Sequence, residues 1–168
     1  MNITNVLELT KSLTGGSAKF SSRPEVKKAR DDFSYLVGGL GAGYGAATNI
    51  NYMTLSKSSV KLADFLVAPL DVAKKVTRIP AEELEQQSAK LFIALIVYRD
   101  GKAVDALLLP SSILPSQKGR SCFAKCFGFL KPSPFRFDKN TKEYVLKIKN
   151  HKSPLMQKHA FGVVVSKL

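Results

Sequence analysis

Two strand-forming stretches separated by only two residues place the strongest constraint on how this chain can fold. Residues 89–99 (AKLFIALIVYR) and 102–109 (KAVDALLL) are rich in side chains that favour strands, and Asp100-Gly101 lies between them. An Asp-Gly pair in this setting is a strong hairpin signal, because both residues tolerate the positive φ angles of a type I′ turn. The sequence therefore predicts an antiparallel hairpin here.

A second hairpin is predicted in the last quarter of the chain. Residues 135–137 and 144–149 flank a polar turn over residues 138–142. Side chains alternate along the second stretch, with Tyr144, Leu146 and Ile148 on one face and Val145, Lys147 and Lys149 on the other. We expect a strand with one apolar and one mostly basic face, followed by a closing strand over residues 160–165.

Short helices are expected in the first third and near the middle of the chain. Residues 5–14 carry a capping-box pattern, and residues 25–32 hold two Lys–Asp pairs at i,i+4 spacing. A third short helix is predicted to begin at Pro80, with acids in its first turn. The glycine-dense residues 33–52 favour a bent strand or a loop, and residues 52–66 alternate as strands do.

These elements predict one α+β domain that is mainly antiparallel β. A length of 168 residues and an apolar content of 45% are ordinary values for a single globular domain. We expect a small curled sheet or a partly open barrel, OB-like at the level of architecture, with two to three short helices. Residues 1–33 would form a helical cover, 34–114 the first part of the sheet, and 115–168 a basic, strand-rich part.

The positive charge of the chain is concentrated at its C-terminal end. Lys and Arg number 26 against 13 Asp and Glu, a net charge of +13. Residues 115–168 hold twelve of these cations and only two acids, Asp138 and Glu143, so this segment alone carries +10. Such an excess is expected of a protein that binds phosphate backbones or another polyanion.

Basic and aromatic side chains are interleaved in the same segment. Single-stranded nucleic acid offers a phosphate at every nucleotide and a ring on every base, so its binders combine cations with exposed aromatic rings. We therefore predict a non-catalytic protein that binds DNA or RNA, with single strands favoured. The candidate contact residues are Lys118, Arg120, Phe123, Lys125, Phe127, Phe129, Lys131, Phe135, Arg136, Phe137, Lys139, Lys142, Lys147 and Lys149. The alternative for the phenylalanines is burial in the core, where most Phe side chains lie.

Two other functional classes remain open at this point. A structural component of a ribonucleoprotein or virion assembly would also be basic where it contacts nucleic acid. The chain could form a homo-oligomer both as such a component and as a simple nucleic-acid binder. A small metal-dependent nuclease would need clustered carboxylates, for which Asp64, a glutamate among Glu82, Glu83 and Glu85, and Lys90 form a conceivable set. The sequence has no nucleophile elbow or catalytic triad, so we assign no catalytic residue.

Cofactor and metal motifs are weak. Gly41 to Ala46 match a GxGxxA pattern, but strand-like residues follow at once and leave no room for the helix that a dinucleotide fold requires. Cys122 and Cys126 with His151 and His159 have a His spacing too long for a zinc finger of that type. We therefore expect no cofactor and no metal.

The remaining sequence features concern the cellular compartment. Two cysteines cannot form a disulfide framework, and we find neither a signal peptide nor a membrane-spanning stretch. No basic amphipathic helix is present to lie on a membrane surface. We expect a protein of the reducing cytoplasm that has no membrane partner.

Overall fold

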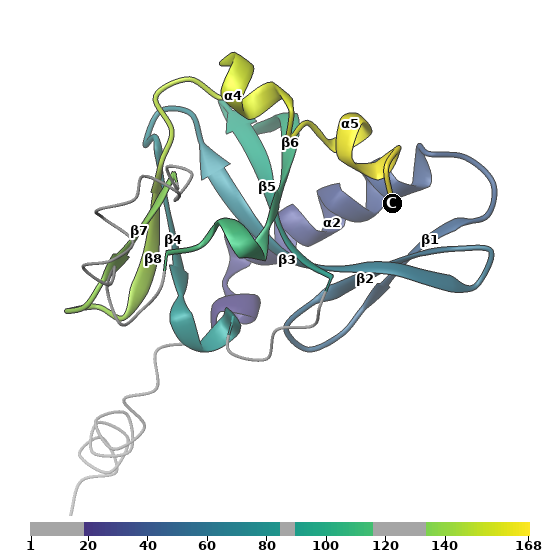
Figure 1. Ribbon diagram of the computed structural model, residues 1–168, viewed down its shortest axis with the longest axis horizontal. Coiled ribbons are helices and arrows are strands. Elements are labelled where there is room, and N and C mark those ends of the chain that lie inside the picture. Colours follow the sequence, from purple (N-terminus) through teal and green to yellow (C-terminus); the bar gives the residue numbers. More distant parts are fainter. Residues whose placement is uncertain (1–18, 85–89, 116–133) are drawn as a thin grey trace, which may run out of the picture.

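The first long element of the computed structural model is helix α2, which begins at Pro24 (Figure 1). Proline suits the first helical turn because its missing N–H would have no partner there. Val26, Ala29, Phe33 and Val37 recur at helical spacing and are the buried residues of α2. The structure describes residues 19–84, 90–115 and 134–168, so the helix expected over residues 5–14 lies outside it.

Two sheets follow the helix. The elements in chain order are η1 (Phe20–Ser22), α2 (Pro24–Gly38), β1 (Tyr44–Thr48), β2 (Met53–Lys57), β3 (Val60–Asp71), β4 (Val76–Pro80), η2 (Ala81–Leu84), β5 (Leu91–Arg99), β6 (Lys102–Pro110), η3 (Ser111–Ile113), β7 (Phe135–Asp138), β8 (Glu143–Lys147), α4 (Pro154–Gln157) and α5 (Phe161–Val165). A five-stranded sheet has the order β1-β2-β3-β5-β6, and a three-stranded sheet has the order β4-β8-β7.

The predicted hairpins are both present. β5 and β6 pair antiparallel, and Asp100 and Gly101 between them have φ angles of 51° and 74°, as a type I′ turn requires. β7 and β8 form the second hairpin. The expectation of an α+β fold with mostly antiparallel strands is confirmed, although β3 and β5 pair in parallel.

The strand pairing does not confirm the finer expectation of one curled sheet or a partly open, OB-like barrel. The described strands form two separate sheets and no closed barrel, because β4 leaves the first sheet and pairs with β8. β4, which belongs to residues 34–114, pairs with β8 of residues 115–168, so the three-stranded sheet draws strands from both of these parts of the chain.

The five-stranded sheet is the middle layer of the fold, as Figure 1 shows. One face packs on α2 and α5 through residues such as Phe65, Ile96 and Leu108. The other face packs on the three-stranded sheet through residues such as Leu66 and Leu95. Burial on both faces explains why residues 91–98 of β5 and 106–109 of β6 are continuous apolar runs.

Two local predictions are changed by the structure. Helix α2 continues through Gly38, and the bent segment begins only after it, with Gly41 and Gly43 at φ angles of 103° and 88° before β1. The strand expected over residues 160–165 is helix α5, in which Phe161 packs edge-on against Phe33 at 5.9 Å between ring centroids. Packing on α2 overrides the strand preference of the valines. Of residues 160–165, Ala160 alone forms a β-bridge, an antiparallel one to Leu107 of β6.

One further property concerns the length and composition of the described helices. None of those within residues 19–84, 90–115 and 134–168 combines the length and the apolar composition needed to cross a membrane.

Candidate nucleic-acid interface

The end of strand β8 and the residues after it place Lys147 and Lys149 in solvent. Tyr144, Leu146 and Ile148 are buried, whereas Lys147 and Lys149 are exposed, as the alternation predicts. Val145 departs from that pattern because it is only 1% exposed. It lies in register between Arg78 of β4 and Arg136 of β7, and long arginine side chains readily cover such an apolar neighbour.

The two acids of the C-terminal segment are paired with a cation from another strand. Arg78 Nη1 lies 3.3 Å from a carboxylate oxygen of Glu143 and 3.8 Å from one of Asp138. The register of β4 and β7 on either side of β8 brings these three side chains to the same end of the sheet. Within the described ranges, no carboxylate forms an ion pair with a lysine or arginine of residues 134–168.

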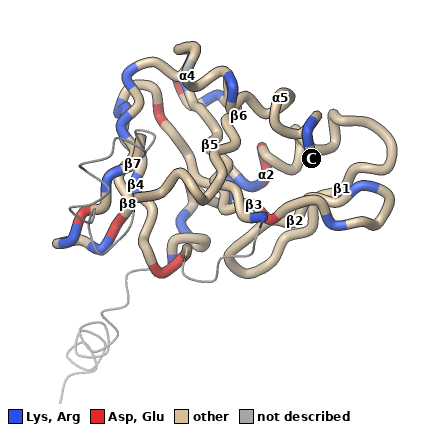
Figure 2. The backbone as a smooth tube through the Cα atoms, viewed as in Figure 1, with Lys and Arg blue, Asp and Glu red and all other residues tan. Residues whose placement is uncertain are grey.

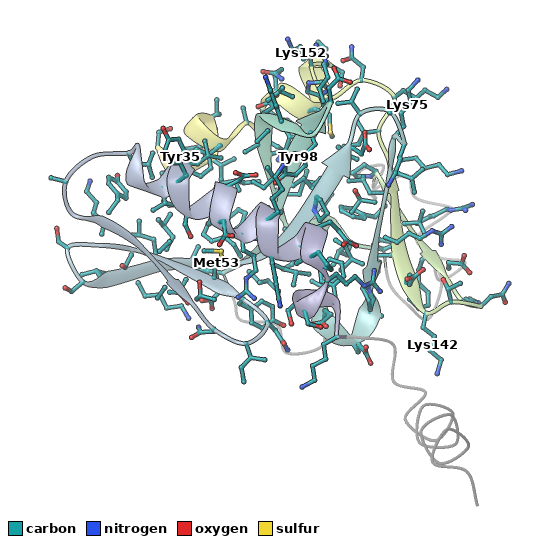
Figure 3. The ribbon with its side chains drawn as sticks, turned by 180° about the vertical axis from the view of Figure 1, so that it is seen from behind. Tyr35, Met53, Lys75, Tyr98, Lys142 and Lys152 are labelled. Atoms are coloured by element: carbon teal, nitrogen blue, oxygen red, sulfur yellow. The ribbon has the colours of Figure 1, made fainter. Side chains whose placement is uncertain are left out.

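The turn between β3 and β4 adds lysines that sequence reasoning missed. Lys74 and Lys75 are exposed, and the backbone N–H of Ile148 donates to the carbonyl oxygen of Lys75 at 3.1 Å. Figure 3 shows Lys75 at one end of the three-stranded sheet, Lys142 at the other, and Lys152 beside α4. The Lys-Lys pair was visible in the sequence, but its position beside β8 follows from a pairing between residues about seventy positions apart.

We call the exposed cations on the three-stranded sheet, in the turns at its ends and just after β8 the basic face. Figure 2 shows blue segments at both ends of the three-stranded sheet. All of its members are exposed: Lys74, Lys75, Arg136, Lys139, Lys142, Lys147, Lys149 and Lys152. Their ammonium and guanidinium groups can contact phosphates without first leaving a buried position.

The predicted aromatic contact residues that the structure describes are less exposed than the cations. Phe135 is 4% exposed and belongs to the core between the sheets, so its ring is not available for stacking on a base. Phe137 is half-buried and tilted by 54° against Tyr144, at 5.2 Å between centroids. Seven predicted contact residues lie outside the described residues: Lys118, Arg120, Phe123, Lys125, Phe127, Phe129 and Lys131.

The described residues bear on the metal candidates, and they place Asp64 of β3 next to Lys90, just before β5, with the Asp64 N–H bonded to the Lys90 carbonyl oxygen at 3.0 Å. In residues 19–84, 90–115 and 134–168, no group of three or more His, Cys, Asp or Glu side chains could hold a metal ion. Asp64 accepts a hydrogen bond from the Thr54 hydroxyl at 2.7 Å and pairs with Lys61 at 2.6 Å. Glu85, Cys122 and Cys126 lie outside the described residues.

Two other titratable side chains have shifted pKa values. Glu83 is 6% exposed, its Oε2 has no hydrogen-bond partner among the described residues, and burial raises the pKa of its carboxyl. Burial, followed by the charge of Lys158, lowers the pKa of His159. Neither residue lies on the basic face.

Comparison with known proteins adds no relative: no protein-family model matches the chain, and no curated protein or solved structure is significantly similar to it.

Proposed function

We propose that this protein binds nucleic acid without catalysing a reaction, and that the basic face contacts the phosphate backbone. The observation that carries the proposal is the charge of this face. Its eight members are exposed cations, and the two acids of β7 and β8, Asp138 and Glu143, are already paired with Arg78. A surface of this kind attracts polyanions through its field and through counterion release.

The preference for single strands is a separate part of the proposal. It depends on aromatic rings that could stack on bases. With Phe135 in the core, this role falls to the half-buried Phe137 and to Phe123, Phe127 and Phe129. The cations alone would serve single and double strands alike.

The decisive experiment is a titration with fluorescent oligonucleotides at two salt concentrations. Four phosphate contacts to a single strand give a log–log slope near −2.8, which is roughly a fifty-fold loss of affinity between 50 and 200 mM salt. Affinity that does not change over this interval would refute the proposal.

Two further ligands separate the two parts of the proposal. A double strand of equal length tests the preference for single strands. An abasic single strand of the same length keeps the phosphates and removes the rings, so it should bind more weakly only if stacking contributes.

A further inference from the structure

A cleft of about 510 Å³ lies between the first half of α2, the end of β3 and the outer edge of β4. Apolar side chains form part of its lining, among them Phe20, Val26 and Tyr98. Four cations also line it, Arg23, Lys28, Lys74 and Arg78, against two acids, Glu25 and Asp71. Because Arg78 is already paired with Glu143 and Asp138, the other three cations exceed the two acids of the cleft by one positive charge, beside its apolar lining.

β4 is an edge strand, and its outer edge faces this cleft. The bonds from Ile148 N–H to Lys75 O and from Ala81 N–H to Lys142 O show which β4 residues direct backbone groups toward β8. In an antiparallel ladder alternate residues point the other way. Val76 and Arg78 are therefore the residues whose backbone groups point away from β8, and both line the cleft.

The acids of the cleft weaken its positive charge only in part. Asp71 is held by its own turn, where one carboxylate oxygen accepts the Ala73 N–H at 2.8 Å. Glu25 is exposed at the start of α2. On the opposite wall, Lys28 is fixed over the Tyr98 ring at 4.6 Å and donates to the carbonyl oxygen of Gly101, so its charge stays at the cleft.

We propose that the cleft binds an extended acidic peptide that adds to β4 as a further strand. The outward N–H and C=O groups of Val76 and Arg78 match the spacing of another peptide backbone, which a phosphodiester chain cannot reproduce. One set of alternate side chains would face the apolar lining. The other set, if acidic, would face the cations.

The first experiment measures binding of a fluorescein-labelled octapeptide of alternating glutamate and valine by anisotropy. A bound strand uses only one of its two edges, so N-methylation of one alternate set of amides should abolish binding, whereas N-methylation of the other set should leave it unchanged. Equal effects of the two methylated series, or no binding of the parent peptide, would overturn the proposal.

The second experiment locates the peptide on the protein. Hydrogen exchange followed by NMR should show slower exchange of the Val76 and Arg78 amides on peptide addition, while the Thr77 and Ile79 amides, already directed at β8, stay the same. Lys74→Glu should weaken binding roughly two- to tenfold.

Lys139→Glu is the matched control for Lys74→Glu, because it makes the same charge change at the distant β7–β8 turn and should alter affinity less than about twofold. Protection of the Val76 and Arg78 amides by a single-stranded oligonucleotide instead of the peptide would contradict the inference.

Discussion

The backbone N–H of Ile148 and the carbonyl oxygen of Lys75 are hydrogen-bonded at 3.1 Å. This bond fixes the β3–β4 turn beside the end of β8, so that Lys74 and Lys75 lie next to the lysines of the C-terminal segment. The basic face is therefore assembled from two parts of the chain, and a peptide of residues 134–168 alone would lack part of it.

Charge reversal on the basic face should weaken nucleic-acid binding. The double variant Lys147→Glu/Lys149→Glu removes two exposed cations, so the log–log salt slope should become less negative by about 1.4 to 1.8, and affinity at low salt should fall at least roughly tenfold. Oligonucleotide titration at several salt concentrations gives both quantities. The control Lys57→Glu/Lys167→Glu changes the net charge equally at exposed sites outside the basic face. Equal losses in the two double variants would assign binding to net charge alone.

The buried carboxyl of Glu83 should make stability depend on pH. Because its pKa is raised in the folded state, the folded protein binds this proton more tightly than the unfolded chain does. This contribution to stability is present at acidic pH and is lost as pH rises from the ordinary glutamate pKa through the raised one.

Glu83→Gln removes the titration, so it should raise Tm by on the order of a few degrees at pH 7 and by less at pH 4. Thermal unfolding by circular dichroism at the two pH values measures the difference. The neighbouring exposed Glu82→Gln serves as control. An equal shift at both pH values would show that the carboxyl charge is not responsible.

Two glycine-to-alanine substitutions should have opposite effects. Gly101 has a φ of 74°, so Gly101→Ala should destabilise the protein by about 1–2 kcal/mol through backbone strain alone, since an added Cβ meets nothing within 4 Å. Gly38 lies in α2 and also has open space, so Gly38→Ala should stabilise the protein by roughly 0.5–1 kcal/mol. Urea unfolding compares the two, and a loss of stability in both would count against the α2 boundary.

The hydroxyl of Tyr98 donates to the carboxylate of Asp32 and joins β5 to α2. Tyr98→Phe should lower the free energy of unfolding by about 1–2 kcal/mol, because the side chain stays buried but loses this bond. Tyr35→Phe makes the same chemical change at a side chain that is 84% exposed and should shift stability by less than about 0.5 kcal/mol. Chemical denaturation of both variants tests the pair.

Local signals predicted the elements that depend on local chemistry. Asp100-Gly101 fixed the β5–β6 turn because both residues adopt positive φ, and the alternation of residues 144–149 predicted the exposed lysines of β8.

Pairings between distant residues could not be predicted in this way. Nothing in residues 76–80 specifies β8 as a partner, and the parallel pairing of β3 with β5 depends on how the segment between them crosses from one strand to the other. The candidate site was also affected, because the exposure of its rings depends on these distant pairings. Phe135 and Phe137 have similar neighbours in sequence, yet one is in the core and the other is half-buried, because sheet packing and not composition decides which rings are exposed.

The departure of β4 from the first sheet also bears on how the chain folds during synthesis. Five strands of the middle layer are complete by Pro110, but the layer that covers their second face needs β7 and β8, which end at Lys147. A nascent or truncated chain that stops between these points leaves Leu66, Leu95 and Leu107 uncovered and β4 without its ladder. Such a fragment is open to self-association, so the last quarter of the chain protects the protein against aggregation.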